Sequence, residues 1–210
     1  MRSAFSDSIR LGTLEAFLSG LDADELQRLH YDFELWARDD QLPPALAAGG
    51  GPWTTWLMLG GRGAGKTRAG AEWVRAIVQR PDACDMRVAL IGETLADARS
   101  VMVEGVSGLL AVHPLHAKPL YEPSKRQITW PNGAIAQIFS ADDPQSLRGP
   151  QFSAAWCDEL CKWRRPDETW DMELEGGDHP AFAVGTDEPA GFFLEFGTAQ
   201  RGAFPWLVPA

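Results

Sequence analysis

A glycine-rich stretch between an apolar run and a helix-like segment most constrains what this chain can fold into. Residues 56–59 (WLML) are apolar, the glycines follow, and residues 68–78 continue with helix-like sequence. The stretch fits the spacing GxxxxGK[ST], in which glycine conformations let successive backbone N–H groups surround phosphate oxygens. The expected phosphate-binding residues are Gly60, Gly61, Arg62, Gly63, Ala64, Gly65, Lys66 and Thr67.

The last two residues of this loop indicate a nucleotide with its metal ion. Lys66 would carry its charge to the β- and γ-phosphates, and Thr67 would offer its hydroxyl to Mg²⁺. The helix that begins here adds the positive end of its dipole. The alternative is a plain glycine-rich turn between a strand and a helix. Because the full signature stands in the strand-to-helix setting that it requires, the sequence predicts a site for ATP and Mg²⁺.

An apolar strand that ends in two carboxylates, residues 152–159 (FSAAWCDE), supplies the second half of a hydrolysis site. In this Walker B pattern the first carboxylate holds Mg²⁺ and the second activates the attacking water. We assign these roles to Asp158 and Glu159. Neighbouring side chains on an extended chain point to opposite sides, so the chain must bend here. The alternative for an isolated Asp-Glu pair is a solvated helix start.

Phosphoryl transfer also needs positive charge near the γ-phosphate, and arginines usually supply it. Arg62 lies inside the phosphate loop and could act in cis. Arg148, just before the Walker B strand, could face the nucleotide of a neighbouring subunit, and Arg99 is a weaker third candidate. For any single arginine the alternative is a solvated surface position.

The region before the loop is expected to be helical, because apolar residues recur at helical spacing over residues 11–38. We interpret it as a lid or packing element. Prolines 43 and 44 and the glycines at 49–51 then interrupt the helix before the loop strand. Gln41 and Trp53 could contact an adenine ring from this position, although an ordinary connector fits equally well.

Downstream, strand-like and helix-like segments alternate, which predicts an α/β fold. Residues 86–92 favour a strand and residues 95–110 a helix, while Asn132-Gly133 predicts a hairpin turn between residues 125–130 and 134–140. We expect a three-layer P-loop NTPase (ASCE-type) with a mainly parallel central sheet. The loop strand and the Walker B strand should be central and close together, with a helical N-terminal extension at one edge.

Length and composition limit the function further. At 210 residues the chain holds one well-cored domain, and its net charge of −10 argues against a broad basic surface for nucleic acid. DNA contacts would need basic side chains that are focused in a pore or small patch, or that are supplied by other subunits or by sequence missing from this chain. No apolar run reaches the length of a membrane span and no secretion signal is evident, so we expect a cytoplasmic protein without membrane contact.

Four segments together resemble the large terminase subunits of tailed phages, especially the gene-transfer-agent-like branch. They are LGGRGAGKTRAGAEWVR, LIGET, SLRGPQFSAAWCDEL and KWRRPDETWDM. The likeness spans roughly residues 33–180. An arginine-bearing phosphate loop together with SLRG ahead of Asp-Glu is considerably more specific than a generic P-loop.

The resemblance implies an ATPase that threads double-stranded DNA into an empty capsid as a homo-oligomeric ring. Its partners would be the portal protein of the procapsid and a small terminase subunit, in the cytoplasm of the bacterial host and transiently at the portal. Arg62 would be the cis arginine, Lys66 and Thr67 the phosphate and Mg²⁺ ligands, and Asp158 and Glu159 the Walker B pair. Gln41 would match the upstream adenine-side motif.

The sequence departs from the family after the Walker B region. A threonine-rich coupling motif is expected on a following strand, but AFAVGTDEPAG offers only Thr186 at the expected place, and Thr198 fits less well. We therefore expect a helical extension over 1–50, an ATPase core over 51–180 and an irregular tail over 181–210. That tail would be truncated or non-native, with no nuclease domain and no nuclease activity.

Three functions remain open on the sequence. The first is the ATP-hydrolysing motor of a DNA-packaging terminase. The second is a helicase-like P-loop ATPase, which shares the loop and the Asp-Glu pair. The third is a truncated remnant that binds nucleotide without turning it over, suggested by the irregular tail.

Overall fold

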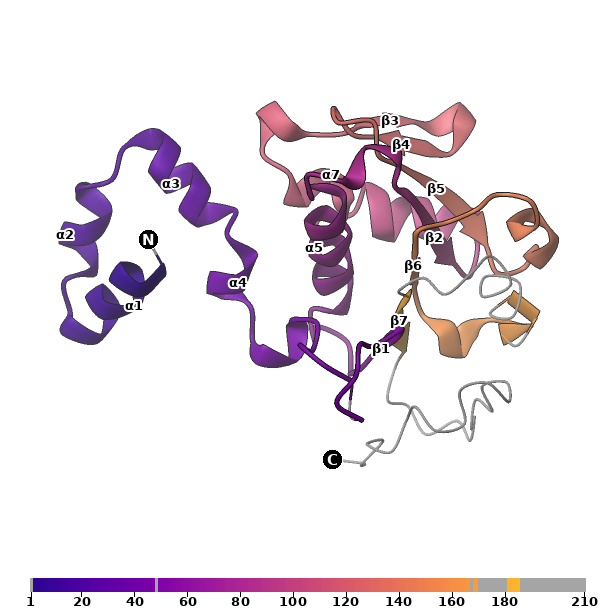
Figure 1. Ribbon diagram of the computed structural model, residues 1–210, viewed down its shortest axis with the longest axis horizontal. Helices are drawn as coiled ribbons and strands as arrows, with labels where there is room; N and C mark the ends of the chain where they lie inside the picture. The colour runs from indigo at the N-terminus through magenta and orange to yellow at the C-terminus, as the bar shows by residue number, and fades with distance from the viewer. Residues whose placement is uncertain (1, 48, 167, 170–180, 186–210) are drawn as a thin grey trace.

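The computed structural model describes residues 2–47, 49–166, 168–169 and 181–185. Within these residues the chain forms a seven-stranded mixed sheet in the order β1-β7-β6-β2-β5-β4-β3 (Figure 1). The strands are β1 Thr55–Leu59, β2 Arg87–Gly92, β3 Leu120–Glu122, β4 Gln127–Thr129, β5 Ile135–Ser140, β6 Ala154–Cys157 and β7 Ala181–Gly185. Strands β1, β7, β6, β2 and β5 run parallel, whereas β4 and β3 are antiparallel additions.

The predicted α/β class with a mainly parallel sheet is therefore confirmed. Strand β2 lies inside the parallel part, and all its residues after Arg87 are buried. A strand covered on both faces is expected to be apolar throughout instead of alternating. The run VALI explains this placement, because Val88 and Leu90 face one core cluster while Ala89 and Ile91 face the other.

One face of the sheet is covered by helices α5 Lys66–Val78, α6 Leu95–Asp97, η3 Ala98–Val103 and α7 Leu109–Val112. Helix α5 carries a continuous buried stripe that includes Ala71, Val74 and Val78. It approaches β6 closely at Gly70, where an added Cβ would lie 2.3 Å from Cε2 of Trp156. This contact fixes the distance between the helix after the phosphate loop and the Walker B strand.

The opposite face is covered by the segment that joins β5 to β6 and by the residues after β6. Two short 3₁₀ turns, η6 Pro144–Leu147 and η7 Leu160–Lys162, lie in these stretches. Leu147, Phe152 and Trp163 pack on this face. Both faces of the sheet are thus covered. On this second face, the described residues that cover the sheet form turns and loops.

The helix predicted over residues 95–110 is interrupted. It divides into α6, the π-helical η3 and α7. Gly105 and Gly108 lie between η3 and α7, and an added Cβ would stand 2.6 Å from the Val101 carbonyl oxygen at the first and 2.8 Å from the Val103 oxygen at the second. Such close turns need glycine, which periodicity alone did not indicate.

The hairpin predicted around Asn132-Gly133 is confirmed, since β4 pairs antiparallel with β5. Gly133 has a φ of +99°, and Asn132 Nδ2 donates to the Val78 carbonyl oxygen over 2.7 Å. Three further 3₁₀ turns complete this half of the chain: η2 Ala83–Asp85, η4 Leu115–Ala117 and η5 Pro123–Lys125.

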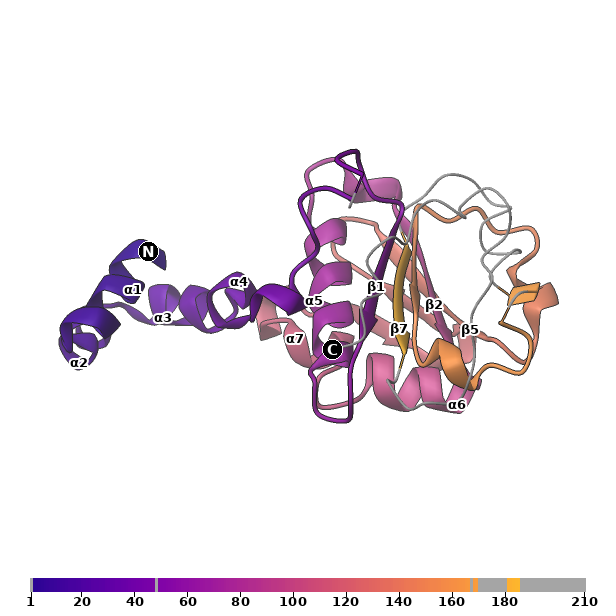
Figure 2. The ribbon, with the colours of Figure 1, turned by 90° about the horizontal axis from the view of Figure 1, so that it is seen from below.

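The N-terminal residues form a helical arm that projects from the sheet beyond α5 (Figures 1 and 2). The predicted helical character is confirmed, but the arm is divided into short pieces and begins earlier than expected. A capping box of Asp22 and Glu25 begins α3, with the Glu25 N–H donating to Asp22 over 2.8 Å. The elements are α1 Arg2–Leu11, α2 Leu14–Ser19, α3 Ala23–His30, α4 Phe33–Trp36 and η1 Asp39–Gln41.

Two expectations about the sheet are wrong. The loop strand β1 is the outer strand of the described sheet, and β7 separates it from the Walker B strand β6. Residues 181–185, assigned above to an irregular tail, form β7 and pair parallel with both β1 and β6. The apolar run AFAV is short enough to fit a buried parallel strand, and only its long-range partners reveal it.

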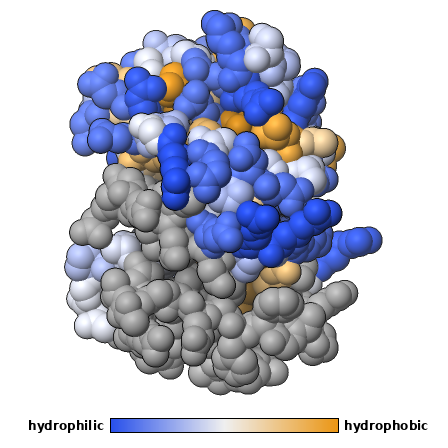
Figure 3. Space-filling view, turned by 90° about the vertical axis from the view of Figure 1, so that its right-hand side faces the viewer, coloured by the Kyte–Doolittle hydropathy of each residue, from blue (hydrophilic) through white to orange (hydrophobic). Residues whose placement is uncertain are grey.

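On the side of the molecule that lies to the right in Figure 1, the described surface is mostly hydrophilic, and its apolar areas are small and separate (Figure 3). None of the described helices is long and apolar enough to cross a membrane.

Candidate nucleotide site

The phosphate loop and the Walker B pair meet at one edge of the sheet. The loop follows β1 and Asp158 follows β6, and parallel strands place their carboxyl ends on the same edge. The structure brings the two halves together: Lys66 Nζ lies 3.9 Å from Glu159 Oε1. The predicted catalytic lysine and glutamate thus share one site.

The loop needs its glycines for two separate reasons. Gly63 and Gly65 have φ values of +84° and +80°, in the left-handed region that favours glycine. At Gly60 a larger residue would not fit, because an added Cβ would lie 2.9 Å from the Ala64 Cβ. Gly65 directly precedes α5, so the loop ends at the positive end of a 13-residue helix.

The Lys66 side chain folds back onto the loop. Its Nζ donates to the carbonyl oxygen of Gly60 over 2.6 Å and to that of Gly61 over 3.2 Å. The residue is only 7% exposed. The ammonium group is therefore satisfied by the loop itself, and an arriving phosphate would compete for the same N–H donors.

Asp158 is buried beside other charged groups. Its burial, together with the neighbouring Glu159 carboxylate, raises the pKa of the Asp158 carboxyl from 3.8 to about 6, although Lys66 and Lys162 act in the opposite direction. Its backbone is fixed on both sides: the N–H donates to the Ile91 oxygen over 2.8 Å and its oxygen accepts from Trp163 Nε1 over 3.0 Å.

Glu159 provides the bend that two adjacent functional carboxylates require. Its φ of +51° and ψ of +47° lie in the left-handed region, which is unusual for a residue other than glycine. Oε2 is buried without a hydrogen bond among the described residues, and Lys162 Nζ lies 3.6 Å from it. Strained backbone and an unsatisfied buried oxygen are features that cluster at functional sites.

The donors present fit a magnesium ion that accompanies a nucleotide. Mg²⁺ prefers oxygen ligands and usually takes only one or two carboxylates, with phosphates and water completing its shell. The hydroxyl of Thr67, in the first turn of α5, and the buried carboxylate of Asp158 are such donors. Asp97 adds negative charge that acts on Asp158, and its own carboxylate accepts from Thr94 Oγ1 over 2.6 Å.

The three candidate arginines are all exposed. The side chains of Arg62 and Arg148 make no hydrogen bond or ion pair with the part of the chain that the structure describes. Arg99 is instead engaged with Glu104, with both N–H···O distances at 3.0 Å. Arg62 lies in the loop, and Arg148 directly follows η6.

Gln41 lies against the phosphate loop, and an unpredicted residue accompanies it. Gln41 Nε2 reaches the Gly65 oxygen at 3.5 Å, and its Oε1 accepts from the Arg38 N–H over 3.1 Å. Arg38 Nη2 donates to the Ala64 oxygen over 2.8 Å. Sequence reasoning missed Arg38. A glutamine three residues after a capping position is a capping-box signal that could have directed attention to it.

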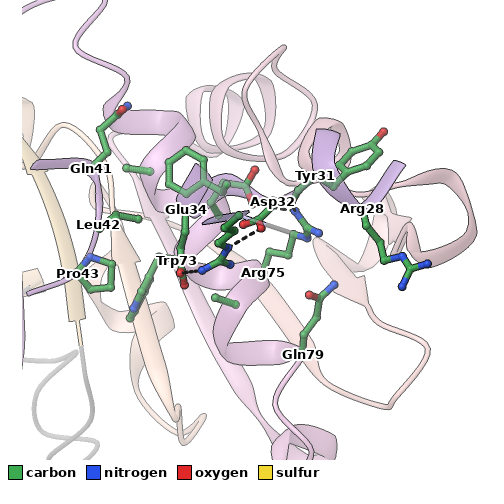
Figure 4. A pocket seen from close by; sticks show the side chains of 15 residues that line it. Arg28, Tyr31, Asp32, Glu34, Gln41, Leu42, Pro43, Trp73, Arg75 and Gln79 are labelled. Atoms are coloured by element: carbon green, nitrogen blue, oxygen red, sulfur yellow. Dashed lines mark hydrogen bonds and ion pairs between the residues drawn. The ribbon is translucent and has the colours of Figure 1, made fainter. Parts of the chain in front are cut away.

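A cavity of about 370 Å³ lies between the arm and α5. In Figure 4, Gln41, Leu42 and Pro43 line one end of it, and Arg28 and Gln79 line the other. The proposed coupling residue Thr186 and its alternative Thr198 lie outside the described residues.

Solved structures with a similar fold are phage terminases. The large terminase from a thermophilic bacteriophage matches with a TM-score of 0.52 and 11% identity, over 63% of this chain and 34% of that chain. A mutant of the large terminase ATPase domain from Thermus phage P74-26 matches with a TM-score of 0.48 and 16% identity, over 66% of this chain and 62% of that one. The chain thus covers less than two thirds of either structure. At 11% identity, the similarity to the large terminase with the TM-score of 0.52 shows only that the two chains share a fold.

No curated protein sequence matches this chain. A family model does: residues 57–200 match the model of the terminase large subunit, T4likevirus-type, N-terminal. The match begins within β1, contains both motifs and continues past β7. Because it covers more than half of the chain, this protein belongs to the family defined by the N-terminal part of T4likevirus-type large terminase subunits.

Proposed function

We propose that the chain is the ATP-hydrolysing motor part of a DNA-packaging terminase. One observation carries the proposal: the loop lysine and the Walker B glutamate lie 3.9 Å apart at a single sheet edge. Charge to hold a phosphate and a base to activate water therefore stand together, as hydrolysis of a phosphoanhydride requires.

Each residue contributes a separate part of the reaction. The N–H groups of the loop and of the first turn of α5 bind the phosphates, and Lys66 exchanges its contacts with Gly60 and Gly61 for phosphate oxygens. Glu159 orients a water for in-line attack on the γ-phosphorus and accepts its proton. Its strained backbone holds the carboxylate toward Lys66 without further rearrangement.

The remaining charge on the γ-phosphate needs additional cations. When bound through Thr67 and Asp158, Mg²⁺ supplies part of that charge. Arg62 would act in cis, and Arg148 would reach the nucleotide of a neighbouring subunit; the exposure of both side chains supports these roles. Each such arginine can contribute roughly 10³- to 10⁵-fold in rate.

The partners are proposed on family membership and on the resemblance given above. They are double-stranded DNA, the portal protein of a procapsid, a small terminase subunit and further copies of this chain in a ring. The site of action would be the cytoplasm of a bacterial host, transiently at the portal. Membership of the gene-transfer-agent-like branch stays a prediction.

The direct test is ATP turnover by the purified chain with and without double-stranded DNA. Wild type should hydrolyse ATP faster with DNA, and Lys66→Ala and Glu159→Ala should both lose turnover. Lys118→Ala, at an exposed lysine that precedes β3, is the matched control and should behave like wild type. Equal turnover in wild type and both site variants would refute the assignment. Unwinding of a forked duplex without a procapsid would instead favour a helicase.

A further inference from the structure

We infer that Arg38 is a positioning residue for nucleotide binding, and that residues 31–41 couple the phosphate loop to the helical arm. We call these residues the strap. The inference rests on the proposed function, because it assigns a role toward the same nucleotide. The strap runs along α5 and is held at both ends.

At its first end, the strap is held by two arginines of α5. Arg75 Nη1 donates to the Tyr31 oxygen over 2.9 Å, and its guanidinium lies 5.7 Å from the centre of the Tyr31 ring. Arg68 lies at the same distance, 5.7 Å, from the centre of the Phe33 ring. The strap therefore begins beside the C-terminal half of α5.

A buried carboxylate fixes both arginines. Glu72 is 5% exposed, and its oxygens lie 2.7 Å from Arg68 Nη2 and 3.0 Å from Arg75 Nη1. Because all three residues belong to α5, this network makes a rigid support for Tyr31 and Phe33. The first end of the strap is thus fixed to the helix that follows the phosphate loop.

At its second end, the strap contacts the loop through backbone carbonyls. Arg38 Nη2 donates to the Ala64 oxygen, and Arg38 is itself oriented by two 3.0 Å contacts with Asp40. Gln41 reaches the Gly65 oxygen. A Cβ on residue 65 would lie 2.2 Å from Gln41 Nε2 and would displace the glutamine side chain, and the φ of +80° at this position favours glycine as well.

These contacts set the direction of the phosphate-binding groups. A peptide unit is planar, so holding a carbonyl oxygen also orients the N–H of the next residue. Arg38 holds the Ala64 oxygen and thereby orients the Gly65 N–H. The Gly65 oxygen accepts from the Ala69 N–H over 2.9 Å, and the 3.5 Å contact of Gln41 Nε2 adds to the restraint on the peptide that carries the Lys66 N–H. The strap therefore contacts the carbonyl side of these two peptide units. Their N–H groups point to the opposite side, where a phosphate would bind.

Between its two ends the strap spans the 370 Å³ cavity, which separates it from α5 (Figure 4). Residues 31–40 are exposed or half-buried, so this part of the strap lies outside the packed core. A nucleotide that fixes the two peptide planes would restrain Arg38 and Gln41, and through them the arm. Linkage requires the reverse effect as well: fixing the strap raises nucleotide affinity.

Calorimetric titration of the full chain with MgADP tests the inference. Arg38→Ala should raise Kd by about tenfold, as expected for one charge-assisted hydrogen bond. Arg38→Lys keeps one donor for the Ala64 oxygen and should restore part of the affinity. Arg10→Ala is the matched control, because Arg10 is also exposed and paired, to Asp7 over 2.8 Å, but lies in α1.

Hydrogen exchange gives a readout that a purely structural role would not change. In wild type, MgADP should slow exchange across residues 31–41, and in Arg38→Ala this protection should be lost. An unchanged Kd and unchanged protection in Arg38→Ala would overturn the inference while leaving the proposed function intact. Failure of wild type to bind MgADP would overturn both.

Discussion

Lys66 Nζ and Glu159 Oε1 stand 3.9 Å apart, and the lysine is held there by two carbonyl oxygens of its own loop. The pair is thus close without forming a short salt bridge. The other carboxylate oxygen, Oε2, lies 3.6 Å from Lys162 Nζ. The Glu159 carboxylate therefore stands between two ammonium groups, and the Lys66 ammonium keeps its hydrogen bonds to the loop.

Glu159→Gln should separate binding from chemistry. The amide keeps the size of the side chain but cannot accept the proton, so ATP turnover should fall by roughly 10²- to 10⁴-fold. The Kd for MgATP should change little. Steady-state turnover and calorimetry measure the two quantities, with Lys162→Ala as the control for the 3.6 Å contact to Glu159 Oε2. A parallel loss of binding would show a structural role instead.

Asp158→Asn should stabilise the fold at neutral and alkaline pH. The folded pKa of Asp158 is raised from 3.8 to about 6 by burial. The protonated Asp158 carboxyl therefore stabilises the folded state fully below pH 3.8, and this stabilisation is lost as the pH rises through 6. At pH 8 without Mg²⁺ the variant should gain up to about 3 kcal/mol. Thermal melts at pH 8 and pH 5 test this, with the exposed Asp143→Asn as control. A lower Tm than wild type at pH 8 would contradict it.

His113 should destabilise the fold in acid. Its Nδ1 donates to the Leu109 oxygen over 2.7 Å, and its Nε2 accepts from Trp130 Nε1 over 2.9 Å, so the ring is neutral. Burial lowers the His113 pKa from 6.5 to about 4. The neutral His113 ring therefore stabilises the folded state fully above pH 6.5, and this stabilisation is lost as the pH falls through 4.

Denaturant unfolding at pH 7 and pH 4.5 measures the size of this loss. His113→Gln should make the difference between the two pH values smaller by about 2 kcal/mol, because the unfolded chain no longer gains stability by protonating an imidazole that stays neutral in the folded core. His116→Gln, at an exposed position in η4, should keep the wild-type difference. An identical pH dependence in both variants would exclude His113 as the cause.

Gly70→Ala should destabilise the fold, although alanine is the better helix former by about 1 kcal/mol. The added Cβ would meet Trp156 at 2.3 Å. Overpacking of this kind costs about 1–3 kcal/mol and would shift α5 relative to β6. Thermal and denaturant melts measure the loss, and ATP turnover measures the shift. Gly51→Ala, where a Cβ meets nothing within 4 Å, is the control.

The parts of this protein that could be predicted from its sequence are those that local physics determines. The phosphate loop, the bend after β6 and the Asn132-Gly133 hairpin each depend on residues close together in the chain. Their conformations follow from glycine and turn preferences, and Asp-Glu after an apolar strand marks the second motif. The proximity of Lys66 and Glu159 followed because parallel strands share an edge.

The parts that could not be predicted depend on residues distant in sequence. Nothing near Arg38 shows that its guanidinium will reach the Ala64 oxygen. The break between η3 and α7 depends on close contacts of Gly105 and Gly108 that appear only in three dimensions. The place of β7 in the sheet depends on pairing with both β1 and β6. The run AFAV by itself therefore predicts only part of an irregular tail.

The position of β7 also orders the folding of the nucleotide site. In the described sheet β1 pairs only with β7, and Thr55 is matched to Ala181, 126 positions later (181 − 55). Closing so long a loop is slow compared with forming β2, β5 and their hairpin. During synthesis, the strand that carries the phosphate loop must wait for residues 181–185 to leave the ribosome. We therefore expect the candidate nucleotide site to be among the last parts of the sheet to assemble.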